Sequence, residues 1–385
     1  MVRTMKSFTN PWPFQNGGDG YSNLTSMAEN NRMRILGLIA RRKYLSQRQL
    51  ADATGMQRST VSYIVRDLKE LGIIREGVAI RADRVGPKET ELEIVPNFAW
   101  SIGLQLDRAV HRLCVVNAMG HILTQETFPP GLSLSEVIST LPRRVSDIAQ
   151  RLSLPMDRLS GIGVSVAGVV DSEDGRVLVS RNLNLQSRAL REELEAVMKC
   201  PVWIDRNVVC GAYAEHFMGA AQDRNSFLYF LLKTDEGRPQ IFGLAMVIGE
   251  QIFRGCNSAA GEVDHTFLAK LFQKPTNWDD ANSMEEFYRS CAEGLAGIVN
   301  LLDMSCMVLC SDDVQLTEVR FQFLNDEVNA DLVPVPGRRV ELLRSGSGMD
   351  GMMIGAALLA LHWSLAAKLT EGRRNESKGK AAVAV

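Results

Sequence analysis

The chain has 385 residues, 45% of them hydrophobic and 23% charged, which is typical of an ordinary globular protein with two or three domains and large cores. No apolar run reaches the roughly 18 residues that span a bilayer, and the start of the sequence has no apolar signal core, so we expect a cytoplasmic protein. The seven cysteines are scattered singly without a CxxC pair, which argues against a zinc knuckle or a disulfide framework and predicts buried free thiols.

Charge is distributed unevenly along the chain. Residues 31–95 carry 13 Lys and Arg against 8 Asp and Glu, an excess of +5, although the net charge of the whole chain is −2. The remainder therefore carries −7, so a small basic module precedes a larger acidic body. This asymmetry predicts a polyanionic partner for the module, although a window this short also reaches such an excess by chance.

Helical periodicity predicts three helices in the basic module. The first covers residues 32–42, and the second begins after the N-cap candidate Ser46 and ends at Gly55. The third is QRSTVSYIVRDLKELG, whose apolar stripe includes Leu71. Two helices joined by a tight turn after a glycine, the second beginning with Gln, Arg, Ser and Thr, are typical of a helix-turn-helix.

The outward face of the third helix is polar and basic, so its side chains can bond base edges and phosphates in a major groove. The predicted DNA contacts on this helix are Gln57, Arg58, Ser59, Thr60, Ser62, Tyr63 and Arg66. Two strands with a turn between them follow and form a basic wing, with predicted contacts at Arg81, Arg84 and Lys88. A three-helix bundle without a DNA function would share the helix spacing. The polar face, the wing and the charge together favour a winged helix-turn-helix domain at residues 29–95.

From residue 96 to 370 the pattern changes to alternating strands, glycine-rich turns and amphipathic helices, one of them predicted from Ser187 to Met198. Strand-strand-helix alternation predicts an α/β fold in two lobes with a cleft between them. Residues 1–28 and 371–385 are polar or rich in small residues and are predicted to be disordered tails.

The motifs GIGVSVAGVVD, SRNLNL, PVWIDRN and IFRGCNSAAGEVDH follow one another in this body. In that order, and behind a winged helix, they resemble the ROK family of repressors, open reading frames and sugar kinases over roughly residues 31–368. The resemblance implies an actin-like ATPase fold in two lobes with a sugar cleft. Family members with an N-terminal winged helix are mostly transcriptional regulators that respond to sugars.

The chain departs from the kinase motifs of the family it resembles. Where the first phosphate loop has the DxGxT pattern, this sequence has Gln105, Asp107 and Ala109, and the second loop falls on GRPQIFG, where Pro239 has no N–H to donate. Asn207 stands where the kinases carry a catalytic Asp, and an amide cannot serve as a general base. We therefore expect no enzymatic activity and no cofactor; a role of Asn207 as a helix N-cap is compatible with that expectation.

A zinc site is also implied by the resemblance, but its ligands are missing. His265 matches the histidine of that site, whereas Thr276, Trp278 and Ser283 stand at its three cysteine positions. Without thiolate ligands a tetrahedral zinc site cannot form, so no metal is predicted.

Unlike the phosphate loops and the zinc site, the sugar-binding side of the implied cleft retains suitable side chains. The resemblance implies sugar-binding positions there, and the effector-binding residues predicted from it are Asn182, Arg206, Asn207, Glu262, His265 and Glu285. In the alternative interpretation, Glu262 and His265 only satisfy buried backbone groups. Arg206 adds a positive charge, which either accommodates an acidic sugar or a sugar phosphate, or pairs with Asp205.

Three functions stay open from the sequence. The leading one is a transcriptional regulator, most simply a repressor, that binds a palindromic double-stranded DNA operator as a homodimer or homotetramer and responds to a sugar or sugar derivative. The second is a constitutive DNA-binding regulator whose body serves only oligomerisation or protein interaction. The third, a sugar kinase with an appended helix-turn-helix, requires the phosphate-loop glycines and the catalytic Asp that this sequence lacks.

Overall fold

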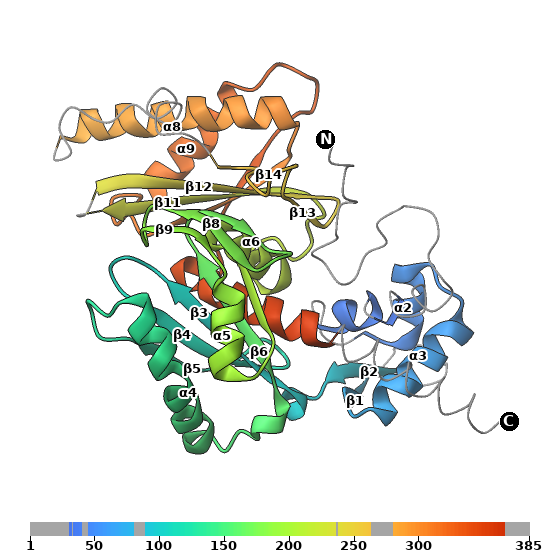
Figure 1. The fold of residues 1–385 in the computed structure, drawn as a ribbon. Helices are drawn as coiled ribbons and strands as arrows, with labels where there is room; N and C mark the ends of the chain where they lie inside the picture. Colours follow the sequence, from blue (N-terminus) through green and yellow to red (C-terminus); the bar gives the residue numbers. More distant parts are fainter. Residues whose placement is uncertain are drawn as a thin grey trace, which may run out of the picture.

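The computed structural model describes residues 31–32, 34–40, 45–80, 89–235, 238–262 and 280–365. A small helical part with a two-stranded sheet stands beside a larger layered body (Figure 1). Both predicted tails lie outside the described residues, and so do four predicted site residues: Arg81, Arg84, Lys88 and His265.

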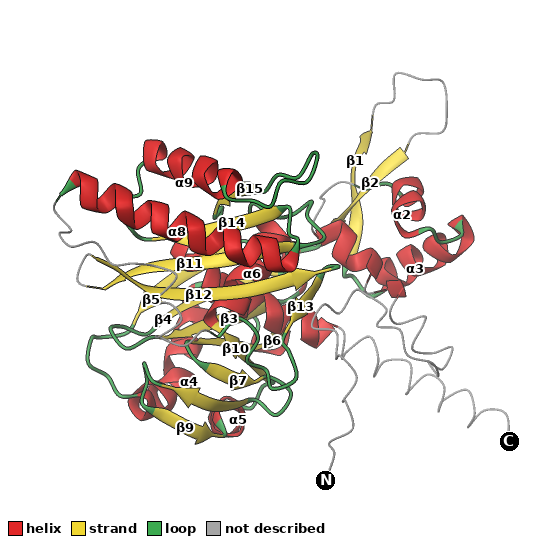
Figure 2. Ribbon diagram, turned by 90° about the horizontal axis from the view of Figure 1, so that it is seen from above, coloured by secondary structure: helices red, strands yellow, loops and turns green. Residues whose placement is uncertain are grey.

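The small part is the predicted winged helix-turn-helix (Figure 2). Its elements are α2 (Gln47–Thr54), α3 (Arg58–Glu70), β1 (Ile74–Ile80) and β2 (Glu89–Ile94), preceded by helical residues at 31–32 and 34–40. Ser46 and Gln49 form a capping box that starts α2. Gly55 ends it with a φ of +69°, a left-handed conformation that glycine adopts without steric cost.

The winged helix shares its core with the body. Leu50, Val61 and Leu68 of its helices lie in the same buried cluster as Ala118 and Leu361 of the body. The predicted domain boundary at residues 95 and 96 falls beside a single 3-10 turn (Pro96–Phe98), which leads directly into the first strand of the body. The orientation of α3 is therefore fixed to the body by packing and not by a free linker.

The body contains two five-stranded sheets with the same topology. The first has the order β10-β6-β3-β4-β5 and the second the order β13-β12-β11-β14-β15. In each, an antiparallel meander of three strands is followed by a strand that pairs in parallel with the first strand of the meander, and then by a strand that pairs in parallel with that added strand. This duplicated arrangement confirms the predicted α/β fold in two lobes.

The strands of the first sheet are β3 (Trp100–Leu106), β4 (Arg112–Asn117), β5 (Ile122–Thr127), β6 (Leu159–Val166) and β10 (Val202–Arg206). Those of the second sheet are β11 (Phe227–Asp235), β12 (Arg238–Ile248), β13 (Gln251–Phe253), β14 (Cys306–Ser311) and β15 (Glu341–Arg344). A three-stranded antiparallel sheet consists of β7 (Val169–Asp171), β8 (Arg176–Ser180) and β9 (Leu185–Arg188).

Helices cover both sheets and fill the space between them (Figure 1). The helices are α4 (Leu134–Arg151), α5 (Leu190–Met198), α6 (Asn207–Met218), α8 (Ala281–Leu302), α9 (Glu318–Ala330) and residues 351–365, with short 3-10 turns at Met156–Arg158 and Gly348–Asp350. The outer core of the first sheet contains α4 and α5, and that of the second contains α8 and α9. The middle core, between the sheets, contains α6 and the helix 351–365.

Strand periodicity explains this layering. Successive side chains of β11 alternate between two cores, as expected for a strand buried on both faces. Those in the middle core are Phe227, Tyr229 and Leu231, and those in the outer core are Leu228, Phe230 and Leu232.

The helix 351–365 packs against its neighbours through glycines. A Cβ on Gly103 of β3 or Gly163 of β6 would lie 2.0 or 1.7 Å from a backbone oxygen of this helix. A Cβ on Gly355 of the helix itself would lie 1.7 Å from the carbonyl oxygen of Cys210 in α6. Because backbone cannot move aside as a side chain can, these positions require glycine.

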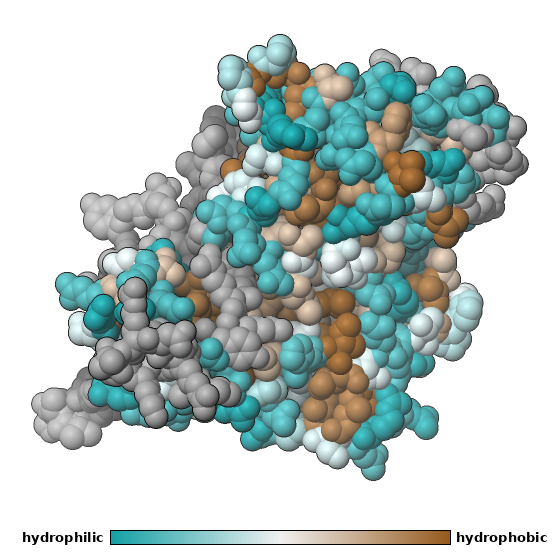
Figure 3. All heavy atoms as spheres, turned by 180° about the vertical axis from the view of Figure 1, so that it is seen from behind, coloured by the Kyte–Doolittle hydropathy of each residue, from teal (hydrophilic) through white to brown (hydrophobic). Residues whose placement is uncertain are grey.

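The surface is mostly hydrophilic, with apolar side chains in patches over the body (Figure 3). Among the described helices, none combines the length and apolar character needed to cross a bilayer. All seven cysteines lie in the described ranges, and five are buried as predicted; Cys200 is half-buried and Cys256 is exposed. Burial raises the pKa of the Cys200 and Cys306 thiols to about 11.

Candidate nucleic-acid interface and interlobe site

The outward face of α3 is exposed as predicted. Val61, Ile64 and Leu68 point into the core of the winged helix. The predicted contacts on the opposite side are exposed, apart from half-buried Thr60. The expectation for Leu71 was wrong: α3 ends at Glu70, and Leu71 is 52% exposed as its C-cap residue.

Positive charge on this face is available to a ligand. The guanidinium of Arg66 lies 5.4 Å from the centre of the Tyr63 ring, and its Nε is 4.0 Å from Glu70. Both partners of this ion pair are more than 60% exposed, so it is screened by water and weak. Arg66 can therefore exchange Glu70 for a phosphate at little cost.

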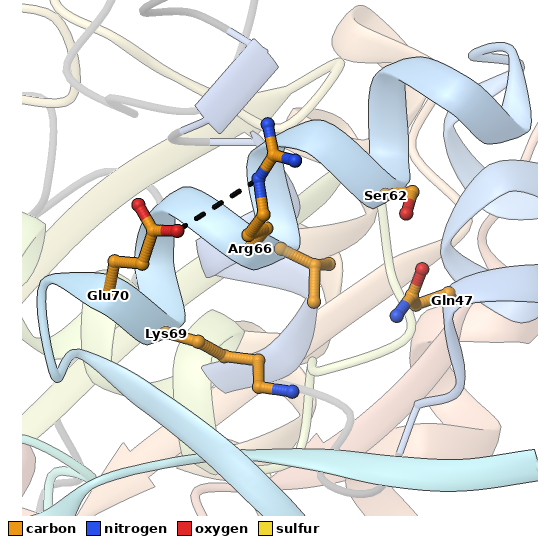
Figure 4. A pocket seen from close by; sticks show the side chains of 6 residues that line it. Gln47, Ser62, Arg66, Lys69 and Glu70 are labelled. Atoms are coloured by element: carbon orange, nitrogen blue, oxygen red, sulfur yellow. Dashed lines mark ion pairs between the residues drawn. The ribbon is translucent and has the colours of Figure 1, made fainter.

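A hollow of about 360 Å³ lies where α2 and α3 meet (Figure 4). Gln47 and Ser62 face each other across it, and Arg66 and Lys69 lie farther along α3 (Figure 4). Sequence reasoning missed Gln47 and Lys69. Lys69 follows Ser62 and Arg66 at helical spacing, which was the available signal.

Ion pairs join the two lobes at the ends of β3 and β10. Asp205, at the end of β10, accepts two hydrogen bonds from Arg254, which follows β13, at 2.8 and 2.5 Å. Burial alone would lower the pKa of Arg254, but the charge of Asp205 outweighs that effect and raises it. The suggested pairing of Arg206 with Asp205 through the side chains is therefore wrong, since the carboxylate of Asp205 is held by Arg254 and bonds only the backbone N–H of Arg206.

Arg206 pairs instead with Glu262. Its side chain is 1% exposed, and its Nη1 donates a hydrogen bond of 3.2 Å to Oε1 of Glu262. Glu262 is 38% exposed and follows β13 in the second lobe. The structure thus brings together these two predicted effector residues, from positions 56 residues apart.

A third interlobe ion pair lies at the end of β3. Asp107 accepts a hydrogen bond of 2.6 Å from Nζ of Lys233 on β11. Asn182, a predicted effector residue, lies near Asp107 and contributes to lowering its pKa. Partial burial would raise the pKa of Asp107, but Lys233 outweighs this and lowers it. An ion pair therefore occupies the position that the family resemblance assigned to a phosphate loop.

We expect the pair Asp107–Lys233 to stabilise the closed body. The side chains are only 18% and 24% exposed, so a double-mutant cycle with Asp107→Asn and Lys233→Met should give a coupling of about 1 to 2 kcal/mol in thermal unfolding at pH 7. Because the folded pKa of Asp107 is lowered, its contribution is complete above the unfolded value of about 3.9 and is lost as the pH falls through the folded pKa.

The matched control is Lys69–Glu76, an ion pair of 2.5 Å whose side chains are 37% and 54% exposed. Its cycle should give only about 0.2 to 1 kcal/mol. Equal coupling in the two cycles would show that the interlobe pair does not hold the lobes together.

The other predicted effector residues are less closely grouped. Asn207 is the first residue of α6, and its side-chain oxygen accepts the N–H of Val208 at 2.9 Å. The N-cap residue of the helix is Arg206, so the suggestion that Asn207 is the N-cap is wrong. Glu285 lies on α8, exposed and paired with Arg289, and no contact among the described residues brings it to Arg206. Within the described ranges no three His, Cys, Asp or Glu side chains are grouped as metal ligands would be.

Sequence reasoning missed Lys233 and Arg254 at this site. Arg254 lies within the motif IFRGCNSAAGEVDH, but its partner Asp205 is 49 residues away. Long-range ion pairs leave no local pattern in a single sequence.

Comparison with known proteins agrees with this architecture. Residues 101–281 match the model of the ROK family, and residues 23–84 match a model of the MarR family. The chain joins a ROK-family domain to a MarR-type winged helix. The predicted recognition is thereby confirmed.

Several relatives carry the name of a repressor. The chain is 26% identical over 238 residues to a protein called putative xylose repressor from Caldicellulosiruptor sp. (strain Rt8B.4); the match covers 61% of this chain and 58% of that relative. It is 21% identical over 375 residues to the xylose repressor of Bacillus spizizenii (strain W23), covering 86% of this chain and 94% of that protein.

Solved structures confirm the fold. A ROK-family transcriptional regulator described as a homologue of the E. coli MLC protein matches with a TM-score of 0.70 at 17% identity, covering 89% of this chain and 99% of that chain. A ROK hexokinase from Thermus thermophilus matches with a TM-score of 0.54 at 21% identity, covering 68% of this chain and 97% of that one. The hexokinase matches a smaller share of this chain than the regulator does, and it shows that a sugar kinase has a fold similar to this one. The fold of the body alone therefore does not distinguish regulators from kinases.

Proposed function

We propose that this protein is a DNA-binding transcriptional regulator, acting as a repressor, whose operator affinity changes when a sugar or sugar derivative binds between the lobes. The observation that carries the proposal is the exposed basic face of α3 on a winged helix that shares its core with the body. The names of the relatives support the same function.

Packing offers a route between the two sites. The helix 351–365 contributes Met353 and Ala357 to the middle core between the sheets, and Leu361 and Leu365 to the core of the winged helix. A change in the angle between the lobes would move this helix, and the helix would displace α3. If the ligand binds more tightly at one angle between the lobes than at another, the resulting displacement of α3 changes the affinity for DNA.

The proposal includes a homo-oligomer, either a dimer or a tetramer, because a two-fold symmetric protein binds two operator half-sites. The second lobe exposes apolar side chains that suit such contacts. Leu301 at the end of α8 is 84% exposed, Val314 before α9 is 90% exposed, and Val319 in the first turn of α9 is 79% exposed.

We also propose that the protein lacks sugar kinase activity. The carboxylate of Asp107 and its partner Lys233 lie where the first phosphate loop of a ROK kinase would be expected, and a carboxylate repels phosphates. Asn207 supplies an amide in place of a general base.

Footprinting of the purified protein on genomic DNA, with and without a panel of sugars, tests the function. We expect protection of two half-sites one or more helical turns apart, and loss of protection with one class of sugar. Protection that no ligand changes would favour the constitutive regulator instead. A monomer that protects no DNA would contradict both.

A further inference from the structure

The side chain of Arg206 has an unused donor group. Its Nη1 bonds Glu262, but its Nη2 is buried and has no hydrogen-bond partner among the residues that the structure describes. A guanidinium carries five N–H donors in a planar fork, and a buried donor without an acceptor destabilises the folded protein. A buried donor of this kind, in a site shared by two lobes, can bond an acceptor atom of a ligand.

The surroundings of Arg206 favour a negatively charged acceptor. Arg206 precedes the 12-residue helix α6 as its N-cap residue, and its side chain makes no capping bond, so the positive end of the helix dipole adds to its charge. The first residue of the helix is Asn207, which is neutral. Asp205 does not compete for the guanidinium, because Arg254 holds both of its carboxylate oxygens.

Groups suited to hydroxyls flank the same point. Glu262 holds Nη1 through one oxygen and is more than a third exposed. Arg206 and Leu106 both pair with Val166 of β6, so the ends of β10 and β3 are about 10 Å apart, two strand spacings. Asn182 lies near the carboxylate of Asp107 at the end of β3 and contributes to lowering its pKa. Arg206 and Asp107 therefore lie at the same edge of the first sheet.

We propose that Nη2 of Arg206 receives the anionic group of a monosaccharide, so that this protein binds a sugar acid or a sugar phosphate in preference to the neutral sugar. A carboxylate and a phosphate both match the guanidinium fork and the helix N-terminus. Glu262 positions the guanidinium through Nη1 and accepts a sugar hydroxyl through its other oxygen. The inference rests on the ligand-binding part of the proposed function and adds the charge of the ligand.

Thermal shift of the full chain without DNA tests the inference. The probes are matched sets: glucose, glucuronate, gluconate and glucose 6-phosphate, and the corresponding galactose, mannose and xylose compounds. We expect at least one anionic member to raise the melting temperature and to bind at least tenfold more tightly than its neutral parent. Stabilisation by the carboxylates or by the phosphates tells which anion the site takes.

Variants assign the effect to Arg206. Arg206→Met should abolish the stabilisation by the anionic sugar, and Arg206→Lys should retain part of it. Asn207→Asp places a carboxylate beside the site without removing a packed side chain, and should weaken binding at least tenfold even if Arg206→Met folds poorly. The matched control is Arg112→Met: Arg112 is also in an ion pair, with Asp350, but is 29% exposed and lies on β4, three strands from β10. Its ligand binding should equal that of the unmodified protein.

Several results would overturn the inference: no anionic sugar of the panel stabilises the protein, neutral parents bind as tightly as their anionic derivatives, or Asn207→Asp and Arg206→Met both leave binding unchanged. Failure of the proposed function is distinguishable from these results. A protein that binds anionic sugars but protects no DNA would refute the regulator and support the anion site. If neutral sugars alone released the protein from DNA, the regulator would be supported and the anion site would be refuted.

Discussion

Replacing Gly163 by valine is expected to unfold the body of this protein. Gly163 lies in the middle of β6, and a Cβ at this position would meet the carbonyl oxygen of Ala356 at 1.7 Å. Relief of that clash requires the helix 351–365 to separate from the sheet, which opens the middle core and disturbs the winged helix as well. We expect a loss of more than about 3 kcal/mol, a large part of a typical stability of roughly 5 to 15 kcal/mol.

Thermal unfolding followed by circular dichroism measures this effect, with Gly163→Ala as the milder variant. Gly297→Ala is the matched control, because Gly297 lies in the exposed face of α8 and a Cβ there would meet nothing within 4 Å. An alanine in a helix is favoured over glycine, so the control should gain up to about 1 kcal/mol. A melting temperature of Gly163→Val close to that of the unmodified protein would mean that the helix does not approach β6 this closely.

The winged helix could be predicted from sequence because its signals are local. Ser46 and Gln49 cap α2 over three residues, Gly55 ends it, and the apolar stripe of α3 repeats at helical spacing. The predicted ends of helices and strands were less accurate where these elements are short. The helix predicted from Ser187 begins instead at Leu190, because Ser187 belongs to β9 and has a positive φ of 49°.

The composition of the interlobe site was predictable only in part. The order of the motifs indicated that Arg206 and Glu262 belong to one site, but the partner of each charge depends on how the lobes meet. Asp205 pairs with Arg254 and not with the guanidinium next to it in sequence, since the side chains of adjacent residues on β10 point to opposite faces of the sheet. The duplicated topology of the two sheets also left no trace in the sequence that we recognised.

Arg58→Ala is expected to weaken binding to the operator by about 10- to 100-fold, or roughly 1 to 3 kcal/mol, and to relax specificity for the base pair that Arg58 contacts. Arg58 is the first residue of α3 and is exposed, and the N-terminal turn of a recognition helix contacts base edges. Arg66 lies two turns farther along the helix, where phosphates are the more common partners. Arg66→Ala should therefore weaken binding to specific and scrambled duplexes alike and reduce the salt dependence by about one phosphate contact.

Fluorescence anisotropy separates the two roles when it is measured with a selected operator and a scrambled duplex over a range of salt concentrations. Arg151→Ala is the matched control, because Arg151 is 56% exposed at the end of α4, on the outer face of the first lobe. It removes the same charge from the protein without touching α3, so its small effect reports long-range electrostatics alone. If Arg58→Ala and Arg151→Ala weakened operator binding equally, α3 would not be the element that contacts the bases. If Arg66→Ala instead lowered only operator affinity, Arg66 would belong with the base-contacting residues, and the phosphate contacts of α3 would fall to Lys69 beside the hollow that it shares with Gln47.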